Sequence, residues 1–190
     1  MIVITLPDIA EEDRLLARAR DGDRRAVAQI YDAYFPPVYQ FIRLRVGDEP
    51  TADDITSQVF AKFIIALRGT NAPDKSLRGW LFRVARNELA NHFRRDEPLP
   101  LETIDEWLAS PPDQGPEVQA LQNIEIERAR QALSMLAPAQ QEVLLLRLDQ
   151  QLSLKETADI MDKNVNAIKA LQFRAVNTLR MILKETEADE

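Results

Sequence analysis

The chain has 190 residues, a formal net charge of −7, no cysteine and one histidine. Without cysteine it can form neither disulfides nor thiolate zinc sites, and the single His92 argues against a multi-histidine metal site. No apolar run approaches the roughly 20 residues that span a bilayer. The N-terminus also lacks a basic start, so we expect no secretory signal and a cytoplasmic location.

Helical periodicity runs along nearly the whole chain, which predicts an all-α protein. A first helix is expected from about Ile9 to Arg20 and a second from about Arg24 to Tyr34. Pro36 and Pro37 should break the second helix, because proline lacks the backbone N–H donor. Both prolines can then occupy the first turn of a third helix that reaches Arg45.

The next expected helix, Thr51 to Leu67, begins with two adjacent acids. Thr51 fits an N-cap, and Asp53 and Asp54 lie in the first turn, where the helix dipole favours anions. The two carboxylates could also hold magnesium, but no second acidic cluster stands at a matching spacing. The chain also lacks a glycine-rich phosphate loop and a nucleophile elbow, so we expect no enzyme activity, metal or cofactor.

The stretch Ser76 to Arg95 predicts a helix with one apolar and one basic face. The apolar stripe consists of Leu77, Trp80, Leu81, Val84, Ala85, Leu89 and Phe93. The other face carries one acid, Glu88, beside Arg78, Arg83, Arg86, Asn87, Asn91, His92, Arg94 and Arg95. Guanidinium and amide groups suit phosphates and base edges, which makes this face a candidate nucleic-acid site. A solvated helix face can have the same composition. Trp80 and Phe82 are expected to pack rather than to stack on bases.

Residues 96 to 116 differ in composition from the helices around them. Their acids face no basic residue, and the segment is interrupted by Pro98, Pro100, Pro111, Pro112 and Pro116. We therefore predict an acidic, proline-rich linker at 98–116 between a domain of residues 1–97 and a domain of residues 117–190. The two small helical domains should be loosely linked in the free chain.

The C-terminal domain carries the pattern of a helix-turn-helix. After helices at Glu117–Leu136 and from Pro138 to near Leu148, Ser153 and Glu156 form a capping box for a short helix. A turn at Asp162 to Asn164 leads into a long helix from about Val165 to Leu183. The final helix has no acid between Val165 and Lys184, and its first turns suit the major groove. The candidate DNA contacts there are Asn164, Asn166, Ala167, Lys169, Ala170 and Arg174.

Taken together, the two halves resemble the extracytoplasmic-function (ECF) sigma factors of bacterial RNA polymerase. In the first half the resemblance rests on LLARARDGDRRAVAQIYDAYFPPVYQFI, ADDITSQVFAKF and SLRGWLFRVARNELANHFRR. In the second half it rests on LAPAQQEVLLLRLDQQLSLKETADIMDKNVNAIKALQFRA. The resemblance implies a non-catalytic protein that binds core RNA polymerase, directs it to particular promoters and helps to melt them.

The resemblance also implies a role for each segment. Asp53, Asp54, Gln58 and Phe60 match the segment that docks on the clamp helices of the polymerase β′ subunit. The loop Gly69 to Ser76 matches the loop that captures a flipped base of the −10 promoter element. The C-terminal domain would bind the −35 element and the β flap, and an anti-sigma factor is a regulator that the family often has. The residues that match the −10 site are Asn71, Lys75, Ser76, Arg83, Arg86, Asn87, Asn91, Arg94 and Arg95.

Two residues of the final helix depart from the family pattern. Leu171 stands where an arginine is usual and Gln172 where a leucine is usual, which indicates a locally altered helix face. Two other classes of protein fit parts of the sequence. One is a helix-turn-helix activator that depends on another sigma factor, and the other is a helical interaction protein whose basic faces bind an acidic partner. Run-off transcription with core polymerase distinguishes these three readings.

Overall fold

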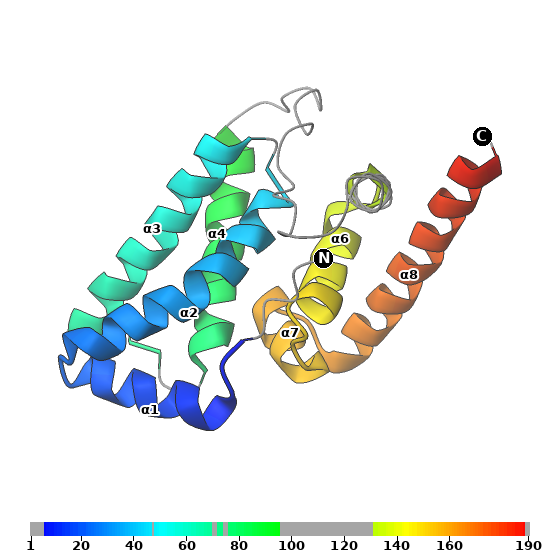
Figure 1. Cartoon of the computed structure of the whole chain (residues 1–190). Coiled ribbons are helices and arrows are strands. Elements are labelled where there is room, and N and C mark those ends of the chain that lie inside the picture. The colour runs from blue at the N-terminus through cyan, green and yellow to red at the C-terminus, as the bar shows by residue number, and fades with distance from the viewer. Residues whose placement is uncertain (1–5, 47, 70–71, 74–75, 96–130, 189–190) are drawn as a thin grey trace, which may run out of the picture.

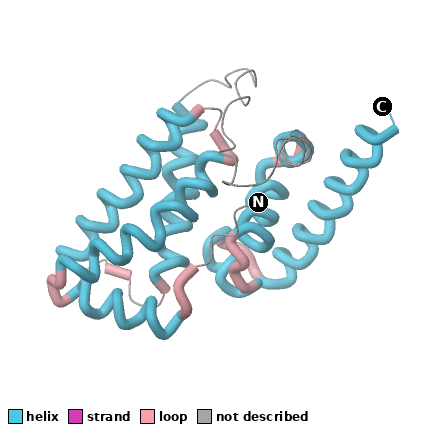
Figure 2. Tube along the Cα trace, viewed as in Figure 1, coloured by secondary structure: helices cyan, strands magenta, loops and turns pink. Residues whose placement is uncertain are grey.

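The computed structural model describes residues 6–46, 48–69, 72–73, 76–95 and 131–188 of the chain. All regular structure within these residues is helical, as predicted (Figure 2). The predicted linker at 98–116 lies outside the described residues, as does most of the helix expected at 117–136. The elements in Figure 1 are α1 (Ile9–Arg20), α2 (Arg24–Arg43), α3 (Glu49–Arg68), α4 (Leu77–Arg95), α6 (Pro138–Leu144), the π-helical turn η1 (Leu145–Asp149), α7 (Leu154–Met161) and α8 (Val165–Ala188).

Helices α1 to α4 pack into one bundle (Figure 1). Apolar residues recur every three or four positions along each helix, which places them on a single inner face. On α2, for example, Ile30, Tyr34, Val38 and Phe41 are all fully buried. The stripe predicted for α4 is buried from Leu77 to Leu89, but Phe93 is 49% exposed and does not belong to the core.

The prediction that Pro36 and Pro37 break α2 is wrong, because the helix runs without interruption from Arg24 to Arg43. A proline in a helix interior removes a backbone hydrogen bond and costs about 3 kcal/mol or more. The apolar repeat nevertheless continues across the prolines, with Tyr34, Val38 and Phe41 all fully buried. Burial of one large apolar side chain contributes about 1.5–3 kcal/mol, so packing on both sides of the prolines offsets their cost.

Helix α3 begins two residues earlier than the sequence pattern predicts. Its N-cap is Asp48 rather than Thr51, and the Asp48 Oδ1 accepts a hydrogen bond from the Thr51 amide at 2.8 Å. Pro50 lies in the first turn, where proline needs no hydrogen-bond partner. Asp53 and Asp54 therefore lie beyond the first residues of the helix, and neither caps it.

The C-terminal half forms the predicted helix-turn-helix from α7 and α8. Ser153 caps α7 by accepting from the Glu156 amide at 3.2 Å, and Glu156 in turn accepts from the Ser153 amide at 2.7 Å. Asp162 ends α7 in the left-handed conformation, with φ at 53°. This sharp stop lets α8 leave in a new direction. The long α8 then packs against α6 (Figure 1).

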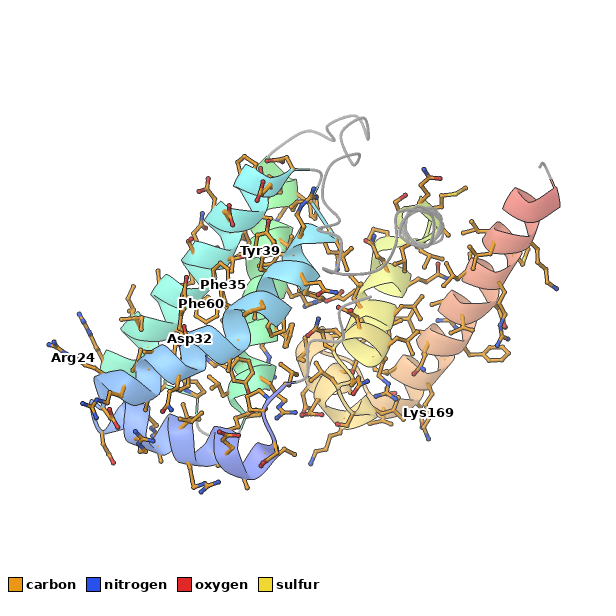
Figure 3. The ribbon with its side chains drawn as sticks, viewed as in Figure 1. Arg24, Asp32, Phe35, Tyr39, Phe60 and Lys169 are labelled. Atoms are coloured by element: carbon orange, nitrogen blue, oxygen red, sulfur yellow. The ribbon has the colours of Figure 1, made fainter. Side chains whose placement is uncertain are left out.

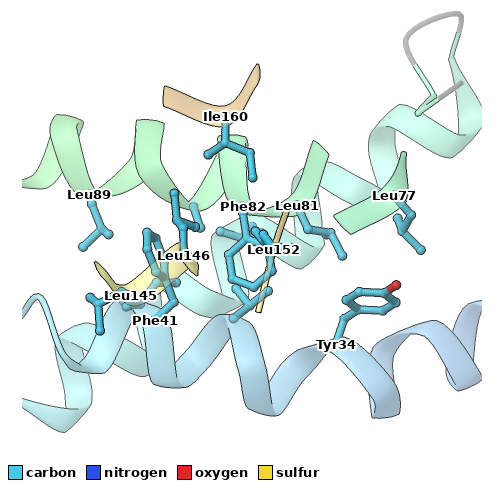
Figure 4. Close-up of a cluster of buried hydrophobic side chains, with 14 of the residues drawn as sticks. Tyr34, Phe41, Leu77, Leu81, Phe82, Leu89, Leu145, Leu146, Leu152 and Ile160 are labelled. Atoms are coloured by element: carbon cyan, nitrogen blue, oxygen red, sulfur yellow. The ribbon is translucent and has the colours of Figure 1, made fainter. Parts of the chain in front are cut away.

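The two halves are in contact, contrary to the expectation of loosely linked domains. Helix α4 packs against α7, and the buried side chains of both halves form one continuous apolar cluster. Figure 4 shows Leu145, Leu146 and Ile160 of the C-terminal half beside Phe41 and Phe82 of the bundle. The sequence pattern could not reveal this contact, because the periodicity identifies an apolar face without identifying the segment that covers it.

Candidate nucleic-acid interface

The start of α4 is held by a buried carboxylate of α1. Glu12 is only 2% exposed, and its Oε1 accepts hydrogen bonds from the amides of Leu77 at 2.8 Å and Arg78 at 3.2 Å. These amides belong to the first turn of α4, where backbone donors have no partner within the helix. Ser76 completes the cap, since its Oγ accepts from the Gly79 amide at 3.0 Å.

The other oxygen of Glu12 joins three elements. Its Oε2 accepts from the Tyr34 hydroxyl at 2.5 Å and from the Arg78 Nε at 2.6 Å. Burial and the hydrogen bond to the Glu12 carboxylate raise the pKa of Tyr34 far above its usual range. Burial alone would lower the pKa of Arg78, but the hydrogen bond and charge of Glu12 outweigh burial and raise it. Tyr34 therefore stays neutral and Arg78 stays charged across the ordinary pH range.

Sequence reasoning missed Glu12, although a signal for it exists. Glu12 precedes Leu15, Leu16 and Ala19 by three, four and seven residues, which places it on the buried stripe of α1. An acid on a buried stripe needs a partner. Here the partners lie on α2 and at the start of the basic helix α4, so Glu12 positions the candidate binding face without touching a ligand itself.

The basic face of α4 divides into two parts. Asn87 and Arg94 are exposed and Asn91 is half-buried, with the Arg94 Nη2 donating to the Asn91 Oδ1 at 2.6 Å. Arg83 and Arg86 instead contact the C-terminal half. The Arg83 Nη2 donates to the Asp159 carbonyl at 2.9 Å, and the Arg86 Nε lies 2.8 Å from the Glu142 Oε1. Asn71, Lys75 and the side chain of Arg95 lie outside the described residues.

The aromatic residues of α4 pack against the bundle, as expected. Phe82 is fully buried and meets Phe41 edge-on, with ring centroids 5.5 Å apart and an interplanar angle of 87°. Trp80 lies against Phe63 at 6.0 Å. Neither ring is free to stack on a base.

The predicted contacts of the second reading helix lie on the exposed side of α8. Asn166, Lys169, Ala170 and Arg174 are exposed and Ala167 is half-buried. Lys169 is labelled in Figure 3, near the start of this helix. Asn164 caps α8, since its Oδ1 accepts from the Ala167 amide at 2.8 Å. Its side-chain oxygen is therefore already occupied, and its amide nitrogen is the group left for a ligand.

The two departures from the family pattern have structural explanations. Leu171 is half-buried and packs against the apolar core of the C-terminal half. Gln172 accepts a hydrogen bond from the Arg147 Nε at 3.3 Å, with its Oε1 toward η1. Both side chains therefore support the helix-turn-helix from within, and neither extends the exposed reading face of α8.

The two basic faces line one open cleft of about 850 Å³ between α4 and the helix-turn-helix. Arg83, Arg86 and Asn87 form one wall, and Lys163 and Asn164 stand on the other. Asp159 and Asp162 also line the cleft, which lowers its positive charge. The structure thus brings together residues that the sequence assigned to two separate binding sites.

A second candidate surface lies on α2 and α3, away from the cleft. Asp53, Asp54 and Gln58 are exposed there, but Phe60 is nearly buried beneath Tyr31 and Phe35, at ring distances of 4.9 and 5.8 Å. Phe60 thus supports this surface rather than presenting itself on it. In Figure 3 its ring lies between α2 and α3, beside Phe35.

The aromatic row above Phe60 was missed by sequence reasoning. Tyr31, Phe35 and Tyr39 follow each other at four-residue intervals on α2, with centroids 5.1 and 6.0 Å apart. Tyr31 is 45% exposed. Partial burial raises the pKa of Tyr39, and the nearby charges of Asp53 and Glu49 raise it further. The row therefore adjoins the acids of α3 and forms one aromatic and acidic surface with them.

Two searches of the described residues found nothing. No group of three or more histidine, cysteine, aspartate or glutamate side chains there is placed to hold a metal ion. No helix in that part of the chain is long and apolar enough to cross a membrane.

Two family models match the chain. Residues 30–98 match Sigma-70 region 2, and residues 126–179 match Sigma-70 region 4. The chain is 36% identical to the ECF RNA polymerase sigma factor BldN of Streptomyces coelicolor, over 94% of this chain and 68% of the relative. It is 31% identical to the ECF RNA polymerase sigma factor SigD of Mycobacterium tuberculosis, over 88% of this chain and 82% of the relative.

Solved structures share the fold. The chain is similar to CnrH in its complex with the cytosolic domain of CnrY, with a TM-score of 0.70 and 24% identity over 92% of this chain and 98% of that chain. It is also similar to RpoE of Bartonella quintana in complex with the anti-sigma factor NepR, with a TM-score of 0.64 and 20% identity over 83% of this chain and 96% of that chain. With the two reading helices and both matched regions in place, the chain belongs to the ECF sigma factors, which direct RNA polymerase to promoters.

Proposed function

We propose that the chain divides promoter recognition between its two halves. Residues 1–97 bind core polymerase and the −10 element, residues 98–116 connect the halves, and residues 117–190 bind the −35 element. The matches to region 2 at residues 30–98 and to region 4 at residues 126–179 support these boundaries. The protein acts in the cytoplasm, with the polymerase, and performs no catalysis of its own.

The observation that carries this division is the pair of basic and amide-rich faces in a chain of net charge −7. On α4 the −10 residues are Arg83, Arg86, Asn87, Asn91 and Arg94, and the loop residues Asn71, Lys75 and Ser76 lie just before that helix. On α8 Asn166, Lys169 and Arg174 stand at the N-terminal end of an acid-free stretch. Amide side chains read base edges and basic side chains hold phosphates, so both faces suit DNA.

Polymerase docks on the aromatic and acidic surface of α2 and α3. Asp53, Asp54 and Gln58 supply exposed polar groups, and Tyr31 supplies an exposed aromatic ring above Phe60. Aromatic residues dominate the binding energy of many protein interfaces. The region 4 half binds the β flap. An anti-sigma factor is a further partner, as NepR is for RpoE of Bartonella quintana.

The test is transcription by core polymerase on fragments of the genome that encodes this chain. Adding the chain should produce transcripts with defined start sites, and the Asn87→Ala and Lys169→Ala variants should reduce their yield. Transcripts that require a second sigma factor would support the helix-turn-helix activator instead. If no transcript depends on the chain, the proposed function is wrong.

A further inference from the structure

We propose that the chain has a closed resting form, in which Glu142 of the C-terminal half holds Arg86 of α4, and that this interface must open before both promoter elements can be read. The inference rests on the proposed −10 role of α4. It concerns the state of the chain before polymerase binds.

Polar contacts join the two halves along several elements. The Arg86 Nε lies 2.8 Å from the Glu142 Oε1 of α6, and the Arg83 Nη2 donates to the Asp159 carbonyl of α7 at 2.9 Å. Further along, the Gln40 Nε2 donates to the Asp149 Oδ1 at 2.8 Å. Two of the arginines predicted to contact DNA are therefore engaged within the protein.

Glu142 balances more than one positive charge. Its residue is 5% exposed, so its carboxylate has little access to water. Besides pairing with Arg86, its charge acts on the buried Arg45, whose pKa is lowered by burial and raised by Glu142. No hydrogen-bond partner for the Arg45 Nη1 is found among the described residues. Removing the Glu142 charge would leave two guanidinium groups at the interface without their anion, which is strongly unfavourable for the closed form.

Apolar packing favours closure as well. Phe41, Phe82 and Leu89 of the bundle are buried in the same cluster as Leu146 and Ile160 of the C-terminal half (Figure 4). Opening would expose part of this surface to water, which costs free energy in proportion to the apolar area. The free chain therefore remains closed until contacts with a partner on each half offset that cost.

The closed arrangement cannot span a promoter. Arg86 and Asn87 of α4 line the same cleft as Asn164 and Ala167 at the start of α8. The −10 and −35 elements are about 25 base pairs apart, which corresponds to roughly 85 Å of duplex at 3.4 Å per pair. Residues on two walls of one cleft cannot reach both elements at once. Separation of the halves is therefore a requirement of two-element recognition.

The closed form can be tested by a distance measurement in the full-length chain. Since the chain has no cysteine, Ile65→Cys in α3 and Met181→Cys in α8 allow one spin label on each half, at exposed positions. Pulsed electron paramagnetic resonance should give one narrow distance distribution for the free chain. Adding Glu142→Gln, or adding core polymerase, should shift the distribution to longer distances. Glu88→Gln is the matched control, because it also removes a nearly buried acid from an ion pair, that with Lys62, but within the bundle.

A second measurement uses the unlabelled chain and a mixed-sequence, single-stranded 20-nucleotide DNA. Apparent affinity scales with the fraction of binding-competent protein, so Glu142→Gln should increase binding by about fivefold or more. Glu88→Gln should change it by less than about twofold, although it removes the same charge. Gln40→Ala removes a different contact between the halves, and it should produce a smaller shift in the same direction even if Glu142→Gln fails to fold.

The outcomes separate the two proposals. A broad distance distribution for the free wild-type chain, or unchanged distances in Glu142→Gln and Gln40→Ala, would overturn the closed form. A narrow distribution that opens as expected, in a chain that supports no transcription, would leave the closed form standing and remove the sigma-factor role.

Discussion

The Glu12 carboxylate of α1 accepts the Leu77 amide of α4 at 2.8 Å, across 65 positions of the chain. The first helix thereby sets where the −10 helix begins. Because Glu12 also binds Arg78 and Tyr34, this one side chain ties three helices of the bundle together.

Replacing Glu12 should destabilise the bundle strongly. In Glu12→Ala the buried Arg78 guanidinium and the Tyr34 hydroxyl lose their acceptor, and breaking a buried ion pair in this way costs about 3–5 kcal/mol. Chemical denaturation monitored by circular dichroism would report the loss. Glu11→Ala, at the exposed neighbouring position, should leave the midpoint nearly unchanged. Equal effects of the two substitutions would contradict the proposed network.

The N-cap of α3 predicts an acid-dependent contribution to stability. Asp48→Ala should cost about 1 kcal/mol near neutral pH, whereas Asp48→Asn should cost less, because asparagine also caps helices. Partial burial acts to raise the pKa of Asp48, but the hydrogen bonds from Thr51 outweigh it and leave the pKa below its ordinary value of 3.8.

The sign of the pH effect follows from that lowered pKa. The contribution of Asp48 is fully present above pH 3.8 and is lost as pH falls through the lower pKa of the folded state. Denaturation curves of the wild type and Asp48→Ala should therefore converge as the pH is lowered below this value. Curves that stay equally far apart would show that the carboxylate charge does not matter for capping.

Lys169 on α8 should contribute to DNA binding. If it contacts a base, Lys169→Ala should weaken binding to a −35 duplex by about 1–3 kcal/mol and relax specificity at one position. If it holds a phosphate, binding should weaken on all sequences alike and the salt dependence should decrease. Fluorescence anisotropy with matched duplexes measures both quantities. Arg180→Ala, at an exposed position farther along α8, serves as the control and should have a smaller effect.

Tyr31 should be an anchor for polymerase. Its exposed ring lies over Phe60, and truncating a central aromatic side chain at an interface commonly costs 2 kcal/mol or more, so we expect a loss of about this size in Tyr31→Ala. Titration of labelled core polymerase would measure the affinity. Ile9→Ala removes an exposed apolar side chain elsewhere on the bundle and should bind like the wild type. A docking surface elsewhere on the chain would leave Tyr31→Ala unaffected.

The helix-turn-helix should gain stability from glycine at its turn. Asp162 has φ at 53°, a conformation that costs most residues roughly 1–2 kcal/mol and glycine very little. Asp162→Gly should therefore raise the melting temperature of the C-terminal half. Asp162→Ala, which keeps the strain and loses the polar side chain, should lower it. A decrease in both would mean that the aspartate makes a contact that outweighs its backbone strain.

The sequence predicted those features that depend on neighbours in the chain. The bounds of α1 and the start of α4, the Ser153 capping box and the burial of Phe82 all follow from local spacing and capping chemistry. Local rules failed at Pro36 and Pro37, where they gave the cost of proline correctly but could not weigh it against burial on both sides.

The candidate site was predictable to the same extent. The arginines and asparagines of α4 could be found from their periodicity, because a helix face is a local property. The pairing of Arg86 with Glu142 and of Arg78 with Glu12 joins residues that are distant in sequence. No pattern in a single segment encodes such a partner. The sequence therefore located the groups that could bind DNA without showing that the fold already occupies two of them.

The shared apolar cluster of the two halves has a consequence for how the chain can be divided. Since Phe82 and Leu146 are buried in one continuous core, each half made alone would present part of an uncovered apolar face. Two fragments separated by a cut between 98 and 116 should therefore reassociate and copurify. Proteolysis at that point would not release an independent −10 or −35 module, and any cellular control that works by cleavage would also need to pull the fragments apart.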